Sequence, residues 1–120
     1  MELALSADDD RRFVEGTPGE EFMRGVEDAA AVLEACMSHR VDRVLLYSEN
    51  LTAGFFDLSS GEAGAILQKL RNYGVRVAIV RSPAVRLSRR FGEMVVEEER
   101  GPYFRLFEDR DAAREWLCGD

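Results

Sequence analysis

Apolar side chains recur along this chain with two different spacings, and each change of spacing marks a predicted element. Residues 2–6 alternate apolar and polar positions, which is typical of a strand with one buried face, and residues 12–15 form a second, shorter strand pattern. Three aspartates at residues 8–10 separate the two runs as a polar turn. The chain is therefore predicted to begin with a β-hairpin.

A helix and a buried strand are predicted after the hairpin. Residues 24–38 carry apolar side chains on one helical face, and residues 43–47 form a short apolar run. A strand that is reached through a helix pairs with the preceding strand by a crossover connection. We therefore expect the strand at 43–47 to lie parallel to its neighbour.

The middle of the chain repeats this helix and strand pattern. A second helical stripe is formed by Ala63, Ile66, Leu67, Leu70 and Tyr73. Gly74 follows at the position where a left-handed residue ends many helices. Residues 75–80 then give the strongest strand pattern in the chain.

The last third of the chain adds two helices and one strand. Ser82 and Pro83 predict an N-cap and a first-turn proline, so we expect a third helix over residues 83–94. Residues 102–107 form the last strand pattern, and Asp109 is predicted to cap a short final helix. The order β-β-α-β-α-β-α-β-α predicts one α/β domain with about four helices and a mainly parallel sheet opened by the hairpin.

Charge and composition narrow the classes of function. The chain has 120 residues and a formal net charge of −7, which argues against general nucleic-acid binding because phosphate neutralisation needs a basic face. No apolar run is long enough to span a membrane, and the N-terminus lacks the basic start and apolar core of a secretion signal. We expect a cytoplasmic protein without a nucleic-acid or membrane partner.

Cysteine and histidine provide little recognisable chemistry. Cys36 and Cys118 lack metal-binding spacing, and a disulfide is not expected in the cytoplasm. His39 is the single histidine and falls at a predicted helix end, where a basic residue suits the helix dipole. With no nucleophile–base pair in view, the sequence predicts no metal, no cofactor and no enzymatic activity.

A pair of serines precedes the second predicted helix. Ser59, Ser60, Gly61 and Glu62 have the form of a capping box, in which Ser59 is the N-cap and Glu62 reaches back to it. The same geometry also suits a phosphorylation switch at Ser59 or Ser60, because a helix N-terminus stabilises a phosphate. The two interpretations are compatible.

Polar residues bracket the long loop after the strand at 43–47. Ligands of open α/β sheets bind outside the carboxyl ends of the strands, which makes Glu49, Asn50 and Asp57 candidates for a binding surface. The competing interpretation is that Asn50 and Thr52 hydrogen-bond the backbone of their own loop.

Two further groups are candidates for the same surface. Arg81, Arg86, Arg89 and Arg90 form a basic cluster near the predicted third helix, either as a solvated face or as a contact for a phosphate or an acidic partner. Phe55 and Phe56 are adjacent aromatics in a loop, and we expect at least one to be exposed as a partner contact or homodimer interface.

The stretch from residue 48 to residue 80 resembles a known bacterial family. The resemblance rests on residues 49–52, 55–58, 61, 64, 66–69 and 72–73. The family is domain of unknown function 4180, and the resemblance covers most of the chain after residue 25. It implies family membership and no particular activity.

The order of elements also resembles that of the STAS domain, the fold of anti-sigma-factor antagonists and of sulfate-transporter tails. In that family a strand leads to an Asp-Ser-Ser-Gly turn that starts a helix, and residues 57–61 here are Asp-Leu-Ser-Ser-Gly. The resemblance implies a STAS-like fold, a regulatory protein partner such as an anti-sigma-factor-like kinase, and phosphorylation of the first serine, Ser59.

Two functions follow from these observations, and structure can distinguish them. A regulatory domain that acts through protein contacts predicts an exposed Phe55 or Phe56 and no deep cavity. A small-ligand sensor that binds at residues 48–57 predicts a concave pocket lined by Asn50, Asp57 and Arg81.

Overall fold

The computed structural model describes residues 3–8, 11–52, 55–56 and 61–119. The strands are β1 (Leu3–Asp8), β2 (Arg11–Gly16), β3 (Arg43–Tyr47), β4 (Arg76–Val80) and β5 (Phe104–Phe107). The α-helices within the described residues are α1 (Ala29–His39), α3 (Glu62–Asn72), α4 (Arg89–Glu98) and α5 (Arg110–Cys118). Short 3-10 turns cover Val26–Asp28 and Ser48–Asn50.

The five strands form one sheet in the order β1-β2-β3-β4-β5. β1 and β2 pair in antiparallel fashion, whereas β2, β3, β4 and β5 run parallel to one another. The predicted hairpin and the predicted parallel crossovers are both confirmed. The chain therefore has the α/β fold class that the spacing of its apolar residues indicates.

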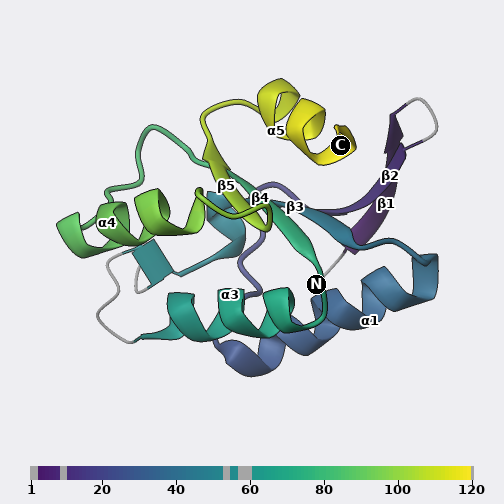
Figure 1. Cartoon of the computed structure of the whole chain (residues 1–120), viewed down its shortest axis with the longest axis horizontal. Coiled ribbons are helices and arrows are strands. Elements are labelled where there is room, and N and C mark those ends of the chain that lie inside the picture. The colour runs from purple at the N-terminus through teal and green to yellow at the C-terminus, as the bar shows by residue number, and fades with distance from the viewer. Residues whose placement is uncertain (1–2, 9–10, 53–54, 57–60, 120) are drawn as a thin grey trace.

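The helices cover the two faces of the sheet unequally (Figure 1). Because successive strands advance in one direction across the sheet, right-handed crossovers place the connecting helices α1, α3 and α4 on the same face. This broad face, as we call it, holds one large apolar cluster that extends from Val14 to Phe104. Of the helices that the structure describes, only α5 covers the narrow face, over a smaller cluster of Phe13, Leu45, Ala78, Ala113 and Leu117.

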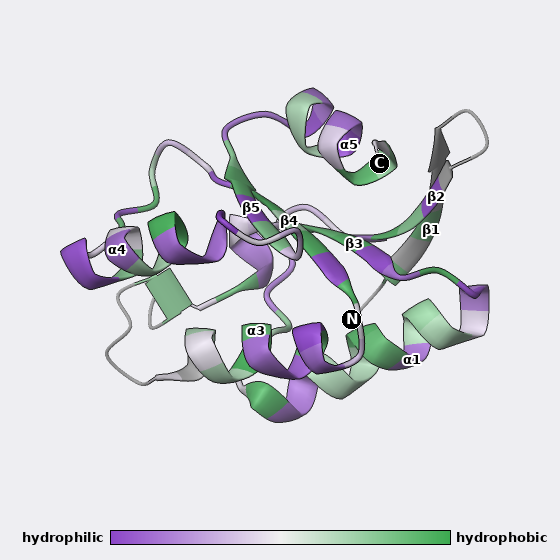
Figure 2. Cartoon of the chain, in the orientation of Figure 1, coloured by the Kyte–Doolittle hydropathy of each residue, from purple (hydrophilic) through white to green (hydrophobic). Residues whose placement is uncertain are grey.

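The hydropathy of each element matches its place between these layers. β3 and β4 have buried side chains at their three central positions on both faces, as expected for strands sandwiched between helices. Figure 2 shows these strands as largely hydrophobic, whereas α3 and α4 alternate between hydrophobic and hydrophilic positions. The helices thus bury one side each and expose the other.

Local signals in the sequence explain where several elements start and stop. The Asp28 carboxylate accepts hydrogen bonds from the backbone N–H groups of Arg24 and Gly25, at 2.9 and 3.0 Å, just before α1. Asp109 caps α5 by accepting from the N–H of Ala112 at 2.8 Å, as predicted. Gly74 has a φ of +73° after α3, which confirms the predicted left-handed ending.

Three local predictions were wrong. α4 begins at Arg89 with Ser88 as its N-cap, so Ser82 and Pro83 lie in a loop before the helix. The N-cap of α3 is Gly61, which puts Glu62 at the first helical position and not at the third, where the expected capping box needs it; Ser59 itself lies outside the described residues. Tyr73, which was expected on the buried stripe, is 64% exposed and is the C-cap residue at which α3 ends.

Cys36 and Cys118 do not form a disulfide bond with each other. Among the described residues, none of the helices combines the length and the apolar character that crossing a bilayer requires.

Candidate functional site

Two loops lie side by side at the carboxyl edge of the sheet. β3 and β4 pair in parallel register with Tyr47 opposite Val80, so both strands end at the same level. The segment that starts at Ser48 therefore leaves the sheet beside the segment that starts at Arg81. This is the edge at which open α/β sheets bind ligands.

Asn50 fixes the first loop from inside. Its side chain is fully buried, and its Oδ1 accepts from the N–H of Tyr47 at 2.7 Å. Its Nδ2 donates to the carbonyls of Thr17 and Glu20, both at 2.7 Å. Asn50 was predicted either to belong to a binding surface or to hydrogen-bond its own loop, and the structure favours the second: this buried amide bonds the backbone of Tyr47 in its own loop and of Thr17 and Glu20 in a second segment.

Gly16 makes room for this buried amide. A Cβ atom at Gly16 would lie 2.4 Å from Asn50 Oδ1, which is too close for any side chain. β2 therefore ends in a glycine because the Asn50 side chain occupies the adjacent space.

Ser48 ties the first loop to the second. Its side chain is buried, and its Oγ accepts from the N–H of Ser82 at 3.0 Å. Within the second loop, the Arg81 guanidinium donates to the Val85 carbonyl from Nε at 3.3 Å and from Nη2 at 3.0 Å. Arg81 therefore holds the shape of the loop and is not among the residues that line the cavity described below, contrary to the sequence prediction.

Phe55 and Phe56 are both buried, with exposed fractions of 1% and 2%. They form an aromatic trio with Phe91 of α4, and the ring centroids are 5.1, 5.7 and 5.4 Å apart. The expectation that at least one of the pair is exposed was wrong. Phe91 of α4 supplies the third ring, which lets two adjacent aromatics enter the same core. This contact was not predicted from the sequence, because the start of the helix was expected at residue 83 instead of Arg89.

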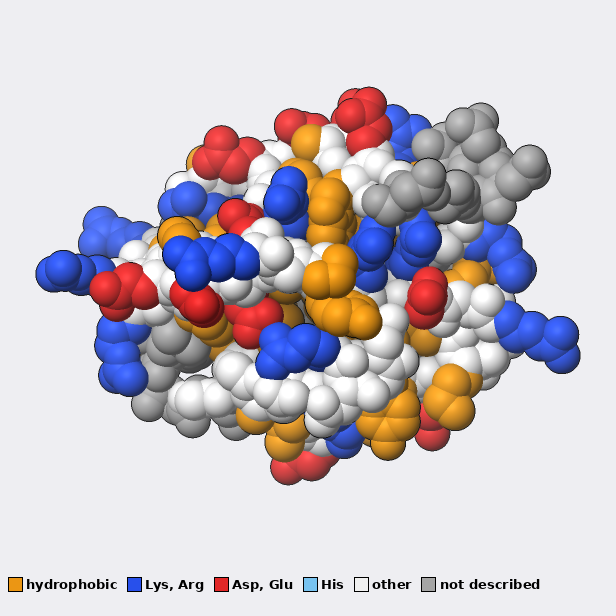
Figure 3. Space-filling model, viewed as in Figure 1, with side chains coloured by type: hydrophobic (Ala, Val, Ile, Leu, Met, Phe, Trp, Pro, Cys, Tyr) orange, Lys and Arg blue, Asp and Glu red, His pale blue; other side chains and the backbone are white. Residues whose placement is uncertain are grey.

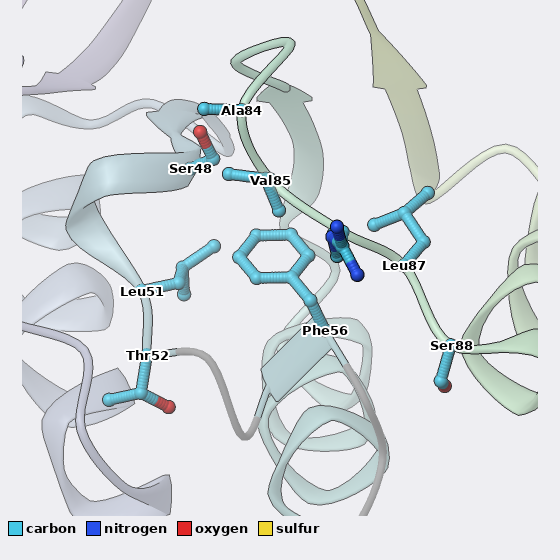
Figure 4. Close-up of a pocket in the computed structure, with 9 residues that line it drawn as sticks. Ser48, Leu51, Thr52, Phe56, Ala84, Val85, Leu87 and Ser88 are labelled. Carbon is cyan, nitrogen blue, oxygen red and sulfur yellow. The ribbon is translucent and has the colours of Figure 1, made fainter.

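A cavity of about 510 Å³ opens between the two loops above this trio. Its lining residues come from residues 48–56 and 84–88, and they are Ser48, Leu51, Thr52, Phe56, Ala84, Val85, Arg86, Leu87 and Ser88. Figure 4 shows the Phe56 ring directed between Leu51 and Val85, with the Ser48 side chain beyond them. The volume lies in the range of ordinary small-molecule sites.

The residues that were predicted to form one surface differ in their position relative to the cavity. Arg86 lines the cavity and is exposed, and Phe56 lines it from below. Glu49 is exposed but does not line it. Asp57, Ser59 and Ser60 lie outside the described residues.

Most of the residues that line the cavity were not singled out from the sequence. Leu51, Thr52, Ala84, Val85 and Leu87 carry no chemical signature, and they meet because the parallel register of β3 and β4 sets their loops next to each other. The one available signal was the prediction that both loops follow neighbouring parallel strands.

The cavity rim is locally basic in a chain with a net charge of −7. Residues 81–92 contain four arginines and no acidic residue. Arg86, Arg89 and Arg90 are exposed, and their guanidinium groups form no ion pair or hydrogen bond with the residues that the structure describes. Figure 3 shows basic side chains gathered, with acidic ones between them, at the end of the molecule where α4 lies.

The perturbed titratable groups lie elsewhere. Burial, with a smaller contribution from Asp42, raises the pKa of the Cys36 thiol to about 11. Burial and the neighbouring Glu15 raise the pKa of Tyr47 to about 12. Neither residue lines the cavity, and no three candidate metal ligands cluster anywhere in the described part of the chain.

Comparison with known proteins identifies the family. Residues 8–117 match the family described as Domain of unknown function (DUF4180). The chain belongs to this family. No curated protein and no solved structure matches the DUF4180 chain. The resemblance seen in residues 48–80 is thereby confirmed, whereas the STAS-like assignment within the α/β class stays a prediction.

Proposed function

We propose that this DUF4180 protein is a non-enzymatic regulatory domain that senses a small ligand in the cavity between residues 48–56 and 84–88. The single observation that carries the proposal is the cavity itself, at the carboxyl edge of a parallel sheet. Both phenylalanines are buried, so the exposed aromatic contact that a protein-docking surface would favour does not occur at Phe55 or Phe56.

The lining favours binding over catalysis. Its polar members are three hydroxyls and one guanidinium, and no carboxylate, imidazole or thiol is among the described residues that form the wall. A hydrolase or transferase of ordinary design needs a general base next to its nucleophile. The groups with shifted pKa values, which often mark catalytic sites, lie outside the cavity.

The position of the cavity supports a regulatory role. The N–H of Ser88 donates to the Phe56 carbonyl at 3.1 Å, so the two sides of the cavity are joined at its base. A ligand that bridges Leu51 and Val85 would add contacts only when both segments hold this arrangement. Ligand binding would therefore shift the population of conformations of the two segments that line the cavity.

The test is a titration of the isotope-labelled protein with a library of small organic fragments, followed by backbone amide NMR. We expect saturable shifts confined to residues 48–56 and 84–88 for some fragments. Val85→Trp fills the cavity and should abolish these shifts. Val96→Trp is the matched control, because Val96 is 60% exposed and does not line the cavity. Binding that persists in a folded Val85→Trp protein would contradict the proposal.

A second candidate function is docking of a regulatory protein partner at the cavity rim. Exposed Arg89, which pairs with no described residue, favours an acidic partner surface there. Phosphorylation of Ser59 would then add negative charge to the protein and weaken binding of an acidic partner. Affinity capture with Ser59→Glu and Ser59→Ala tests it: a partner retained by the alanine form and lost with the glutamate form supports docking, and identical retention contradicts the switch.

A further inference from the structure

The cavity wall is divided into an apolar part and a donor part. The apolar part consists of Leu51, Phe56, Ala84, Val85 and Leu87. The donor part consists of Ser48, Thr52, Ser88 and Arg86, and no acidic side chain is among the described lining residues. A ligand that matches this wall needs an apolar body together with a group rich in hydrogen-bond acceptors.

Two hydroxyls of the wall, those of Ser48 and Thr52, are oriented as donors by the backbone around them. Ser48 Oγ accepts from the N–H of Ser82 at 3.0 Å, and Thr52 Oγ1 accepts from the N–H of Phe55 at 3.3 Å. A hydroxyl whose oxygen already accepts keeps its O–H for a further partner. Among the described residues no acceptor is recorded for either O–H, so both remain able to donate to a ligand.

Arg86 sets the charge preference. It is the only charged side chain among the described residues of the wall, and no described residue neutralises it. The other arginines of residues 81–92 add positive potential around it, since that segment contains no acid. Arginine donates through a planar fork that fits a carboxylate or a phosphate.

We propose that the ligand of this cavity is a small organic anion, with an aromatic or aliphatic body on Phe56 and an acidic group at Arg86. This inference rests on the proposed function, because it names the chemical class that the sensor recognises. A volume of about 510 Å³ accommodates a body of one or two rings and is too large for a bare inorganic anion to fill. The apolar wall binds the body, and the donor set selects the charge.

The test uses pairs of probes that differ only in charge: phenylacetate with phenylacetamide, indole-3-acetate with indole-3-acetamide, and octanoate with octanamide. Dissociation constants are measured by NMR titration at low ionic strength, with acetate as the anion that lacks a body. We expect at least one acid to bind about tenfold more tightly than its amide and than acetate. The preference should shrink as salt is added, because Arg86 is exposed.

Arg86→Gln should remove the preference and leave the affinity for the amide unchanged. Arg90→Gln is the matched control, because Arg90 is an exposed arginine of the same segment that does not line the cavity. A preference that survives Arg86→Gln, or that is lost equally in Arg90→Gln, overturns the inference.

The failure of this inference is distinguishable from that of the proposed function. If acids and amides bind equally and Val85→Trp abolishes both, the proposed sensor function stands and the inference of an anionic ligand is overturned. If phenyl phosphate binds and none of the three carboxylates does, the ligand is still an anion and its acidic group is a phosphate. Absence of binding by every acid and by the phosphate overturns the anion, and absence of binding by the whole fragment library overturns the sensor as well.

Discussion

The broad face of the sheet is held mainly by a large apolar cluster, with an ion pair between α3 and α4 (Arg71–Glu98, 2.7 Å), whereas the narrow face is held by a small apolar cluster with charged groups at both ends. On the broad face, Phe91 of α4 packs with Phe55 and Phe56 and joins the large cluster. On the narrow face, Arg110 of α5 pairs with Glu15 of β2 at 2.9 Å. One helix has little area to bury, so directional contacts add to its packing.

The opposite end of α5 has its own charged contacts. Arg43 donates to the carbonyls of Leu117 and Gly119, where the helix ends and its carbonyls lack helical partners. Arg76 and Arg105 lie over the Trp116 ring, at 5.2 and 5.9 Å from its centroid. The cavity lies at the edge of the broad face, where Leu51, Phe56, Val85 and Leu87 belong to its wall and also pack in or against the large cluster.

Among the substitutions considered, Phe91→Ala is expected to cause the largest loss of stability, and it tests the packing of the broad face. It removes a fully buried ring that both loop phenylalanines contact, and such truncations cost about 3–5 kcal/mol. Urea denaturation measures the loss in the free energy of unfolding. Phe91→Leu is the control and should cost clearly less; a cost below about 1 kcal/mol for the alanine variant would show that the trio is not a stabilising unit.

Trp116→Leu tests the narrow face and should cost about 1–2 kcal/mol. The change keeps an apolar side chain but removes the ring that Arg76 and Arg105 cover and that Phe107 contacts at 5.8 Å between centroids. Each cation–π contact contributes about 0.5–1 kcal/mol. A double-mutant cycle with Arg76→Gln measures the coupling, and additive effects would argue against a cation–π contribution.

Tyr47→Phe sharpens the comparison through pH. The pKa of Tyr47 is raised to about 12, first by burial and then by Glu15. A tyrosine in the unfolded chain has a pKa of about 10. Between these values the unfolded chain binds fewer protons than the folded one, so stability falls as pH rises.

The contribution of the Tyr47 hydroxyl should therefore be complete below about pH 10 and decline between about pH 10 and 12. Denaturation of the wild type and of Tyr47→Phe across this range isolates the effect, since all other groups are shared. A stability difference that does not change with pH would contradict the assignment.

The two cysteines give the smallest expected effect. Cys36 is buried on the broad face, and its pKa is raised to about 11, whereas Cys118 is half-buried beside the narrow cluster. Because the thiolate is the reactive form, Cys118 should react with an aromatic disulfide reagent at pH 8 well before Cys36. In Cys118→Ala the remaining thiol should react only when the protein unfolds; a fast reaction there would show that the broad face opens readily.

Much of the fold could be predicted from the sequence because short-range signals specify it. The hairpin, the parallel strands and the Asp109 cap follow from alternation, helix–strand order and one side-chain oxygen at the right position. The start of α4 could not be predicted in this way, since Ser82 and Ser88 both have the chemistry of a cap. Ser82 became a loop residue because its N–H binds Ser48, 34 residues away.

The site was less predictable because its members are defined by long-range contacts. Asn50 has a polar side chain of the kind usually found at the surface. It is buried because its amide donates to the carbonyls of Thr17 and Glu20, which are distant in the sequence. Arg81 and Arg86 have the same residue type and neighbouring positions, yet one clamps its own loop and the other lines a cavity. A single sequence does not distinguish such pairs.

The order of the strands has a consequence for how the chain acquires this structure. β1 to β5 lie in the sheet in the order in which they are synthesised, so each strand finds its neighbour in the segment that has just emerged. The main exception is α5, whose Arg110 meets Glu15 across 95 residues. Because closing such a long loop is slow, we expect the sheet and its broad face to gain protection from hydrogen exchange first in refolding, with α5 docking as the last step.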